Sequence, residues 1–206
     1  MPTAEWSATP FVPDTTSLPA LATASQGCRG CPLWQSATQT VFGEGARSSS
    51  LLLIGEQPGD QEDGQGHPFV GPAGRVLWSC VDDAGISRDD VYATNAVKHF
   101  KHERRGKRRL HKKPTTAEIE ACHPWLEAEL RAVRPAVVVV LGATAARSLI
   151  GRTTAIAANR GKHLVVHGLP TVVTYHPSAV LRADDRAAEI RQALVHDLQL
   201  ARRWSS

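Results

Sequence analysis

The stretch 136–142, "AVVVVLG", is the longest apolar run in the chain. Four successive valines followed by a leucine are typical of a strand that is buried on both faces of a sheet. The run ends at a glycine, and the next residues, "ATAARSLI", have the apolar spacing of a helix. A buried strand that leads directly into a helix predicts an α/β protein.

Four further apolar runs follow the same pattern: "SLLLIG" (50–55), "DVYATNAV" (90–97), "HLVVHG" (163–168) and "PTVVTY" (170–175). Helical patterns occur at about 73–84, 116–131 and 184–203. Strands separated by helices imply a mainly parallel sheet with helices on both faces. We therefore expect a three-layer α/β/α sandwich around a central, mainly parallel four-stranded sheet.

The length of 206 residues suits one well-cored domain, and the chain has no repeat or obvious linker. We expect a single domain over residues 1–206 that begins with an irregular, proline-rich arm over 1–26. The start lacks the features of a signal peptide, and no apolar run has the length of a membrane span. Four cysteines without a secretory context indicate a reducing compartment. These features favour a monomeric cytoplasmic protein without membrane contact.

The positive charge of the chain is concentrated in one segment. Residues 98–113 hold nine Lys and Arg and one acid, so the rest of the chain holds 24 − 9 = 15 basic and 20 − 1 = 19 acidic residues. The whole net charge of +4 therefore comes from these sixteen residues. A basic patch this local predicts contact with a polyanion, most simply a nucleic acid. A solvated loop or a localisation signal is the alternative.

Chemically unusual residues follow four of the predicted strands. In parallel sheets, ligands bind beyond the carboxyl ends of the strands, so these residues should meet at one edge. The first strand leads into the acidic, glycine-rich "GEQPGDQED" (55–63), and the second leads into "NAVKHF" (95–100). Gly142 and Thr144 follow the third and begin a helix whose N–H groups could bind a phosphate. The last strand leads into "HPS" (176–178). Together they predict an enzyme site.

The spacing Cys28-x-x-Cys31, flanked by glycines and a proline, is a strong metal half-site. Cys80 and Cys122 are both available for the other half. Cys80 lies on the apolar stripe of its predicted helix, where a buried structural thiol is the ordinary explanation.

Six motifs in this order carry a family resemblance: "CRGCPLW" (28–34), "GEQPGDQED" (55–63), "PFVGPAGR" (68–75), "TNAVKHF" (94–100), "KRRLH" (107–111) and "HPSAVLR" (176–182). The chain resembles the uracil-DNA glycosylase superfamily over nearly its whole length. It is most similar to the UdgX branch, which is close to the family-4 iron–sulfur glycosylases. The "KRRLH" motif marks the branch, with Leu110 where isoleucine is expected.

The resemblance implies an enzyme that flips a uracil out of DNA and cleaves its N-glycosidic bond. Phe69 would be the aromatic platform, and Asn95 would bond N3–H and O4 of uracil. His176 would stabilise charge that develops on O2. Gln57 and Asp60 would complete the substrate-binding residues. Without the resemblance, Phe69 could be a core residue and Asn95 a turn cap.

In the UdgX-like branch the histidine of the basic motif attacks the sugar C1′ and stays bonded to the DNA. Here that residue is His111, and Glu56 would fix its tautomer and stabilise the imidazolium. The alternative is that His111 is one more phosphate donor. The expected DNA-binding residues are Lys107, Arg108, Arg109, Gly142, Thr144, Ser178 and Arg182.

For the metal, the resemblance implies Cys28, Cys31, His99 and Cys122 as ligands, since His99 stands where family-4 members have a cysteine. Ligand types alone suit zinc as well as iron–sulfur, and only the resemblance favours a [4Fe–4S] cluster. We expect uracil-containing DNA, preferably single-stranded, as the partner. Two alternatives remain: a turnover glycosylase in which water captures the sugar, and a non-catalytic nucleic-acid-binding iron–sulfur protein.

Overall fold

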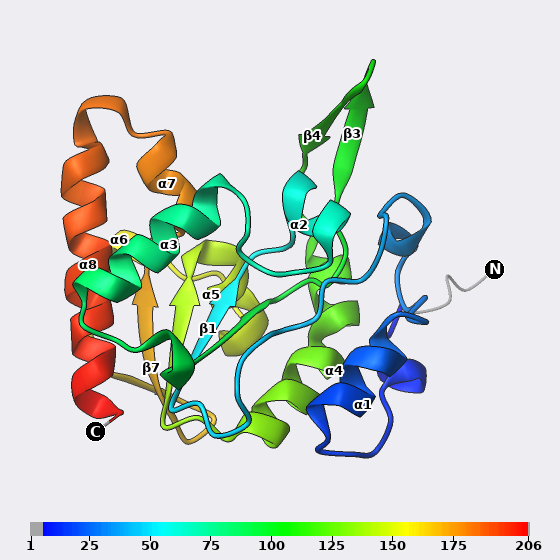
Figure 1. Ribbon diagram of the computed structural model, residues 1–206, viewed down its shortest axis with the longest axis horizontal. Coiled ribbons are helices and arrows are strands. Elements are labelled where there is room, and N and C mark those ends of the chain that lie inside the picture. Colours follow the sequence, from blue (N-terminus) through cyan, green and yellow to red (C-terminus); the bar gives the residue numbers. More distant parts are fainter. Residues whose placement is uncertain (1–5, 206) are drawn as a thin grey trace.

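The computed structural model describes residues 6–205, which form a central sheet with helices on both faces and a separate two-stranded hairpin (Figure 1). The strands are β1 (Leu51–Gly55), β2 (Val91–Asn95), β3 (His102–Arg105), β4 (Arg108–His111), β5 (Val137–Leu141), β6 (Leu164–Val166) and β7 (Leu169–Thr174). The α-helices are α1 (Leu18–Ser25), α2 (Asp60–Gln65), α3 (Pro72–Asp83), α4 (Thr116–Val133), α5 (Gly142–Ile150), α6 (Ile156–Asn159), α7 (Ser178–Leu181) and α8 (Ala187–Trp204). Short 3₁₀ turns are η1 (Thr9–Phe11), η2 (Pro32–Gln35), η3 (Arg88–Asp90) and η4 (Asp184–Arg186).

The central sheet has the strand order β2-β1-β5-β7-β6, in which the first four strands are parallel. The predicted strand at 163–168 is β6, which pairs antiparallel with β7 at the edge, so the sheet has five strands and not the expected four. The cause is a two-residue turn, because His167 and Gly168 both have positive φ, at 51° and 79°. This backbone geometry matches the turns that join hairpin strands.

Two apolar clusters cover the two faces of the sheet and confirm the sandwich. One face packs against α3 and α8, with Leu77, Val81 and Leu194 among the buried side chains. The other packs against α4 and α5, with Leu126 and Leu149 among them. All five residues of β5 are buried, as its run of valines predicts. None of the helices within residues 6–205 is both long and apolar enough to cross a membrane.

The N-terminal arm is not wholly irregular as expected, because it contains α1. The Ser17 side chain caps this helix by accepting from Ala20 N–H, and Pro19 stands in its first turn, where a missing N–H costs nothing. Leu21 of α1 is fully buried in a third apolar cluster, against residues of α4. Residues 1–5 of the expected arm lie outside the described residues.

The basic segment is a β-hairpin rather than a loop, and it projects from the edge of the molecule beside α2 (Figure 1). Gly106 begins its two-residue turn at φ 60°, a conformation that glycine adopts without strain. In the antiparallel register, His102 lies opposite His111. The hairpin therefore carries His111 at the end of its second strand.

Candidate active site

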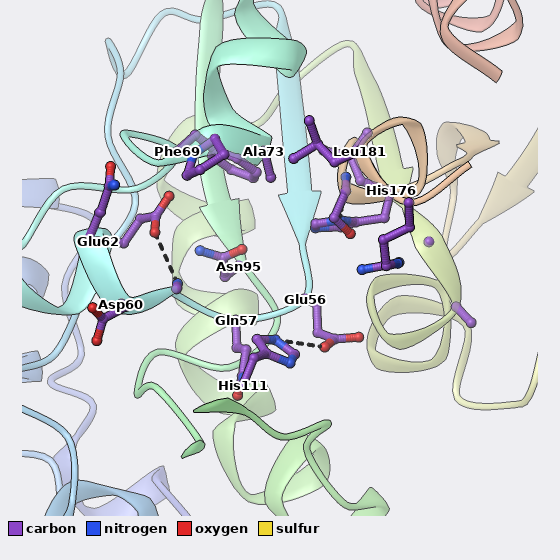
Figure 2. A pocket seen from close by; sticks show the side chains of 18 residues that line it. Glu56, Gln57, Asp60, Glu62, Phe69, Ala73, Asn95, His111, His176 and Leu181 are labelled. Carbon is purple, nitrogen blue, oxygen red and sulfur yellow. Dashed lines mark hydrogen bonds and ion pairs between the residues drawn. The ribbon is translucent and has the colours of Figure 1, made fainter. Parts of the chain in front are cut away.

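A cavity of about 750 Å³ lies where the carboxyl ends of the parallel strands meet. The three predicted catalytic residues and the four predicted substrate-binding residues all line it, and Gly142, Ser178 and Arg182 do so as well. They come from the segments that follow β1, β5 and β7, from the last residue of β2 and from the hairpin, as the topology of the sheet requires. Figure 2 shows Phe69, Asn95, Glu56, His111 and His176 around this space.

Phe69 and Asn95 approach each other over the end of β1, and Gly55 makes this approach possible. A Cβ atom at Gly55 would lie 2.3 Å from Asn95 Oδ1 and 2.7 Å from Phe69 Cζ. Phe69 has a left-handed backbone with φ 57°, which a bulky residue adopts only when its surroundings hold it there. Its carbonyl accepts a hydrogen bond from Trp78 Nε1 at 3.2 Å. The ring and the amide thus form one wall of the cavity.

Glu62 holds the loop of Phe69, a role that the sequence analysis missed. Its carboxylate accepts from Gly71 N–H at 2.8 Å and from Gly59 N–H at 3.1 Å, and so joins two walls of the cavity. Any larger residue at Gly59 or Gly71 would crowd this carboxylate. Glu62 stands three residues after the N-cap Gly59 and bonds its N–H, which is the carboxylate half of a capping box, and this spacing was the available signal.

His176 is presented as a neutral hydrogen-bond donor. Its Nδ1 accepts from Ser178 N–H at 3.2 Å and lies 2.7 Å from Ser178 Oγ, so the proton of a neutral ring belongs on Nε2. Burial lowers the pKa of His176 to about 4, although the Glu56 carboxylate acts in the opposite direction. A Cβ atom at Gly142 would lie 2.9 Å from His176 Cβ, so Gly142 is needed for the approach of β5 and β7 here.

Glu56 lies between two partners at the mouth of the cavity. Thr144 Oγ1 donates to its Oε2 at 2.5 Å, and His111 Nε2 lies 3.3 Å from its Oε1 (Figure 2). The predicted contact of Thr144 with DNA is therefore corrected, because Thr144 is buried and its hydroxyl binds Glu56. His111 is half exposed and lies beside the Phe100 ring, with ring centroids 6.1 Å apart.

Arg109 also requires a correction, because its guanidinium is bound by two carboxylates of α2. It pairs with Asp60 at 2.6 Å and with Asp63 at 2.5 Å, and it donates to Thr38 Oγ1 at 3.0 Å. Asp63 has no exposed side-chain surface. Arg109 therefore anchors the hairpin to α2 instead of extending towards a DNA phosphate.

Gln57 lines the cavity, but its amide is occupied by the hairpin rather than free for a substrate. Its Oε1 accepts from Lys101 N–H at 3.1 Å, and its Nε2 donates to the carbonyls of Lys101 and Lys112 at 3.2 and 3.0 Å. These two lysines flank the hairpin on either side. Gln57 thus holds both ends of the hairpin at the cavity, and its predicted role in binding the base stays a prediction.

Four of the nine cations in the basic segment are paired internally: Lys98, Lys101, Arg109 and Lys112. The other five are exposed and carry no ion pair with any of the described residues: Arg104, Arg105, Lys107, Arg108 and Lys113. The electrostatic surface available to a polyanion is therefore the hairpin tip and its flank, which include the predicted Lys107 and Arg108.

Three of the four predicted metal ligands lie together behind the sheet. Cys28, Cys31 and Cys122 are buried in one apolar cluster, and burial raises the pKa of Cys122 to about 12. Trp125 Nε1–H donates to Cys28 Sγ at 3.2 Å, and Lys98 N–H donates to Cys122 Sγ at 3.3 Å. Hydrogen bonds of this kind support sulfur ligands in metal centres.

His99, the fourth predicted ligand, hydrogen-bonds Thr40 Oγ1 through Nε2 at 3.0 Å. Burial lowers its pKa to about 4, so the ring is neutral, as a metal ligand must be. Thr40 donates in turn to Ser25 O, which also accepts from Cys28 N–H, so the ring is linked to the cysteine segment. Cys80 lies in the separate cluster of α3 and is not part of this group. The donor types fit a thiolate-rich centre, although no three such side chains within 6–205 have metal-binding geometry.

Comparison with known proteins gives a consistent family assignment. The family model for the uracil DNA glycosylase superfamily matches residues 42–199. A type-4 uracil-DNA glycosylase of Thermotoga maritima is 36% identical over 177 residues, which cover 85% of this chain and 88% of that protein. A type-4 enzyme of Archaeoglobus fulgidus is 36% identical over 162 residues, with 75% and 78% covered. A type-5 uracil-DNA glycosylase of Pyrobaculum aerophilum is 39% identical over 102 residues, with 45% and 41% covered. By its fold, its cavity and these matches, the chain belongs to the uracil DNA glycosylase superfamily.

Proposed function

We propose that this protein excises uracil from DNA and then captures the sugar C1′ through His111, which gives a stable protein–DNA adduct. One observation carries the capture step. A half-exposed imidazole on a basic hairpin lies 3.3 Å from Glu56, at the mouth of the cavity that Phe69, Asn95 and His176 line. The excision step is supported by family membership and by the type-4 enzymes that this chain resembles.

The cavity suits a flipped pyrimidine. Its volume of about 750 Å³ is within the range of small-ligand sites, and the Phe69 ring offers a face for stacking. The Asn95 amide has a donor and an acceptor, which match O4 and N3–H of uracil. His176 would donate from Nε2 to O2, where negative charge develops as the base departs.

Cleavage and capture then follow as two steps. The C1′–N1 bond breaks, and its electron pair goes to uracil, whose charge His176 stabilises. The sugar becomes an oxocarbenium ion, which the Glu56 carboxylate stabilises. One imidazole nitrogen of His111 gives its lone pair to C1′ and forms a new C–N bond, while the other nitrogen keeps its proton. That proton faces Glu56, which stabilises the imidazolium product or accepts the proton from it.

The anchoring of the hairpin supports capture over release to water. Arg109 and Gln57 tie the hairpin to α2 and to the end of β1, so His111 is held in place before DNA binds. A nucleophile fixed near the reacting carbon has a large advantage over a diffusing water molecule. The exposed cations at the hairpin tip would bind flanking phosphates.

Cys28, Cys31, Cys122 and His99 are the residues that would hold an iron–sulfur cluster in this protein. Its proposed role is structural, because these residues link the N-terminal arm to α4 and lie away from the cavity. When bound, the cluster would crosslink these segments and stabilise the fold.

The test is a denaturing gel of the protein mixed with single-stranded DNA that contains one uracil. The wild type should give a denaturant-resistant conjugate, and His111→Ala should not. His102→Ala is the matched control, because His102 lies directly across the hairpin and should leave the conjugate intact. Abasic product without a conjugate would indicate the turnover enzyme, and salt-sensitive retention alone would indicate a binding protein. The same gel with double-stranded DNA tests the expected preference for single strands.

A further inference from the structure

Two buried polar clusters lie directly behind Asn95 and His176. Thr94 directly precedes Asn95 in β2, and Thr174 is the last residue of β7, two residues before His176; each hydroxyl donates to a carboxylate with no exposed surface. Thr94 Oγ1 donates to Glu129 at 2.9 Å, and Thr174 Oγ1 donates to Asp197 at 2.6 Å. Glu129 comes from α4 and Asp197 from α8, which cover opposite faces of the sheet (Figure 1).

The first cluster, Thr94–Glu129–Lys98, also holds the backbone of Asn95. Lys98 Nζ donates to Glu129 Oε2 at 2.5 Å, to Thr94 Oγ1 at 2.6 Å and to Asn95 O at 2.8 Å, which uses all of its N–H groups. Glu129 further accepts from Tyr92 Oη at 3.1 Å. Lys98 is only 1% exposed, so the cluster is closed to solvent.

The second cluster, Thr174–Asp197–Arg160, is built in the same way two residues before His176. Arg160 binds Asp197 with two N–H groups of its guanidinium, one on Nε at 3.0 Å and one on Nη2 at 2.9 Å. Its guanidinium carbon also lies 5.5 Å from the ring centre of Tyr175, the residue between Thr174 and His176. The carboxyl end of β7 is therefore held through the hydroxyl of Thr174, and the residue after it is held through the ring of Tyr175.

Stability alone does not account for these clusters. Burying an ion pair is costly, and apolar residues of the same volume often stabilise a fold as well or better. The central strands β1 and β5 have no polar side chains, so this core is held by apolar packing elsewhere. The buried charges instead stand at the two strand ends that lead into the cavity. A fully satisfied polar cluster fixes one geometry, whereas apolar contacts allow several.

We propose that Glu129 and Asp197 are positioning residues, which set Asn95 and His176 separately through Thr94 and Thr174. This inference rests on the proposed excision of uracil. The two clusters should then control different properties. The first should govern how tightly uracil is bound, because Asn95 contacts the base in both ground and transition states. The second should govern the rate, because His176 responds to charge that develops only during cleavage.

The experiment measures two quantities for each variant: the inhibition constant of free uracil and the single-turnover rate of uracil release at saturating DNA. Thr94→Val should raise the inhibition constant about tenfold, the size of one well-placed hydrogen bond, and change the rate by less than about threefold. Thr174→Val should lower the rate about tenfold and leave the inhibition constant within about threefold. Thr94→Ser and Thr174→Ser keep the hydroxyl and should restore both quantities.

A matched control separates positioning from general destabilisation. Thr171→Val makes the same change on β7 at a buried residue whose hydroxyl bonds Leu169 O. This variant should leave the two quantities unchanged. If Thr94→Val does not fold, Thr94→Ala is measured instead, because the smaller side chain leaves room for water at the Glu129 carboxylate.

The inference is overturned if the two variants change both quantities by the same factor, or if both behave like Thr171→Val. A wild-type protein that releases no uracil would instead overturn the proposed function, and this inference with it.

Discussion

Replacement of Arg109 with alanine should release the hairpin without weakening the attraction to DNA. Its guanidinium pairs with Asp63, which has no exposed surface, and with Asp60, whose side chain is 60% exposed. Its neighbour Arg108 is exposed and has no ion pair among the described residues. Replacement of Arg109 should therefore impair the docking of the hairpin, whereas replacement of Arg108 should weaken DNA binding.

The magnitude for Arg109→Ala follows from the buried partner. Removing one member of a buried pair costs about 3–5 kcal/mol, whereas an exposed pair such as that with Asp60 contributes about 0–1 kcal/mol. Asp63 keeps its hydrogen bonds from Thr38 N–H, and Gln57 still holds the ends of the hairpin, so the lower limit applies. About 3 kcal/mol lowers the ratio of docked to undocked hairpin by roughly 150-fold. Adduct formation should slow by up to this factor.

The assay combines the rate of adduct formation with the salt dependence of DNA binding. Arg108→Ala should reduce the slope of log affinity against log salt by about 0.7, the value for one phosphate contact on a single strand. Arg109→Ala should leave that slope unchanged and slow capture more than it slows uracil release. A reduced slope in Arg109→Ala, with capture intact, would show that this side chain contacts DNA and that the anchoring argument is wrong.

Three further outcomes follow from the site. His111→Ala should abolish the adduct and release abasic DNA, while Glu56→Gln should slow both cleavage and capture, as measured on denaturing gels with separate quantification of free uracil; a persistent conjugate in His111→Ala would point to another nucleophile. Cys122→Ser should lose bound iron and thermal stability, whereas Cys80→Ala should keep its iron, as read from absorbance and melting curves; bleaching by the Cys80 change would refute the ligand set. Burial lowers the pKa of His176 to about 4, so the unfolded chain binds this proton first as the pH falls from 6.5 to 4. His176 should therefore contribute a decline in stability of up to about 1.4 kcal/mol per pH unit over that window, so the decline should be less steep in His176→Asn, as urea denaturation at several pH values would reveal.

The fold was predictable because its strands are short apolar runs that lead into helices. The valines of β5 have no alternative to burial on both faces, and the rule that ligands bind at strand ends then brings Glu56, Asn95 and His176 to one cavity. The hairpin was missed because its strands consist largely of cations, which have low strand propensity and no apolar alternation. Its sequence indicates only positive charge, while its structure depends on the turn at Gly106 and on contacts with Asp63 and Gln57.

The roles of individual polar residues depend on contacts that a local pattern does not contain. Arg109 and Arg108 are neighbours in the same basic run, and only the position of α2 assigns one to anchoring and leaves the other exposed. Thr144 stands at a helix start that suits a phosphate, but its hydroxyl donates a hydrogen bond to Glu56, which follows another strand. Such assignments are decided by which partner lies within hydrogen-bond distance after folding.

Within residues 6–205, three acidic side chains have no exposed surface, and they extend this point. Asp63 holds the hairpin of His111, Glu129 holds the strand of Asn95, and Asp197 holds the end of β7 that leads to His176. Each is a costly burial that an apolar residue would avoid, and each is linked to a different group at the cavity. Because the groups are held separately, a change in one carboxylate should alter one property of the enzyme and leave the others in place. The geometry of the site therefore depends on residues that never touch the substrate, and a search confined to the cavity lining would overlook all three.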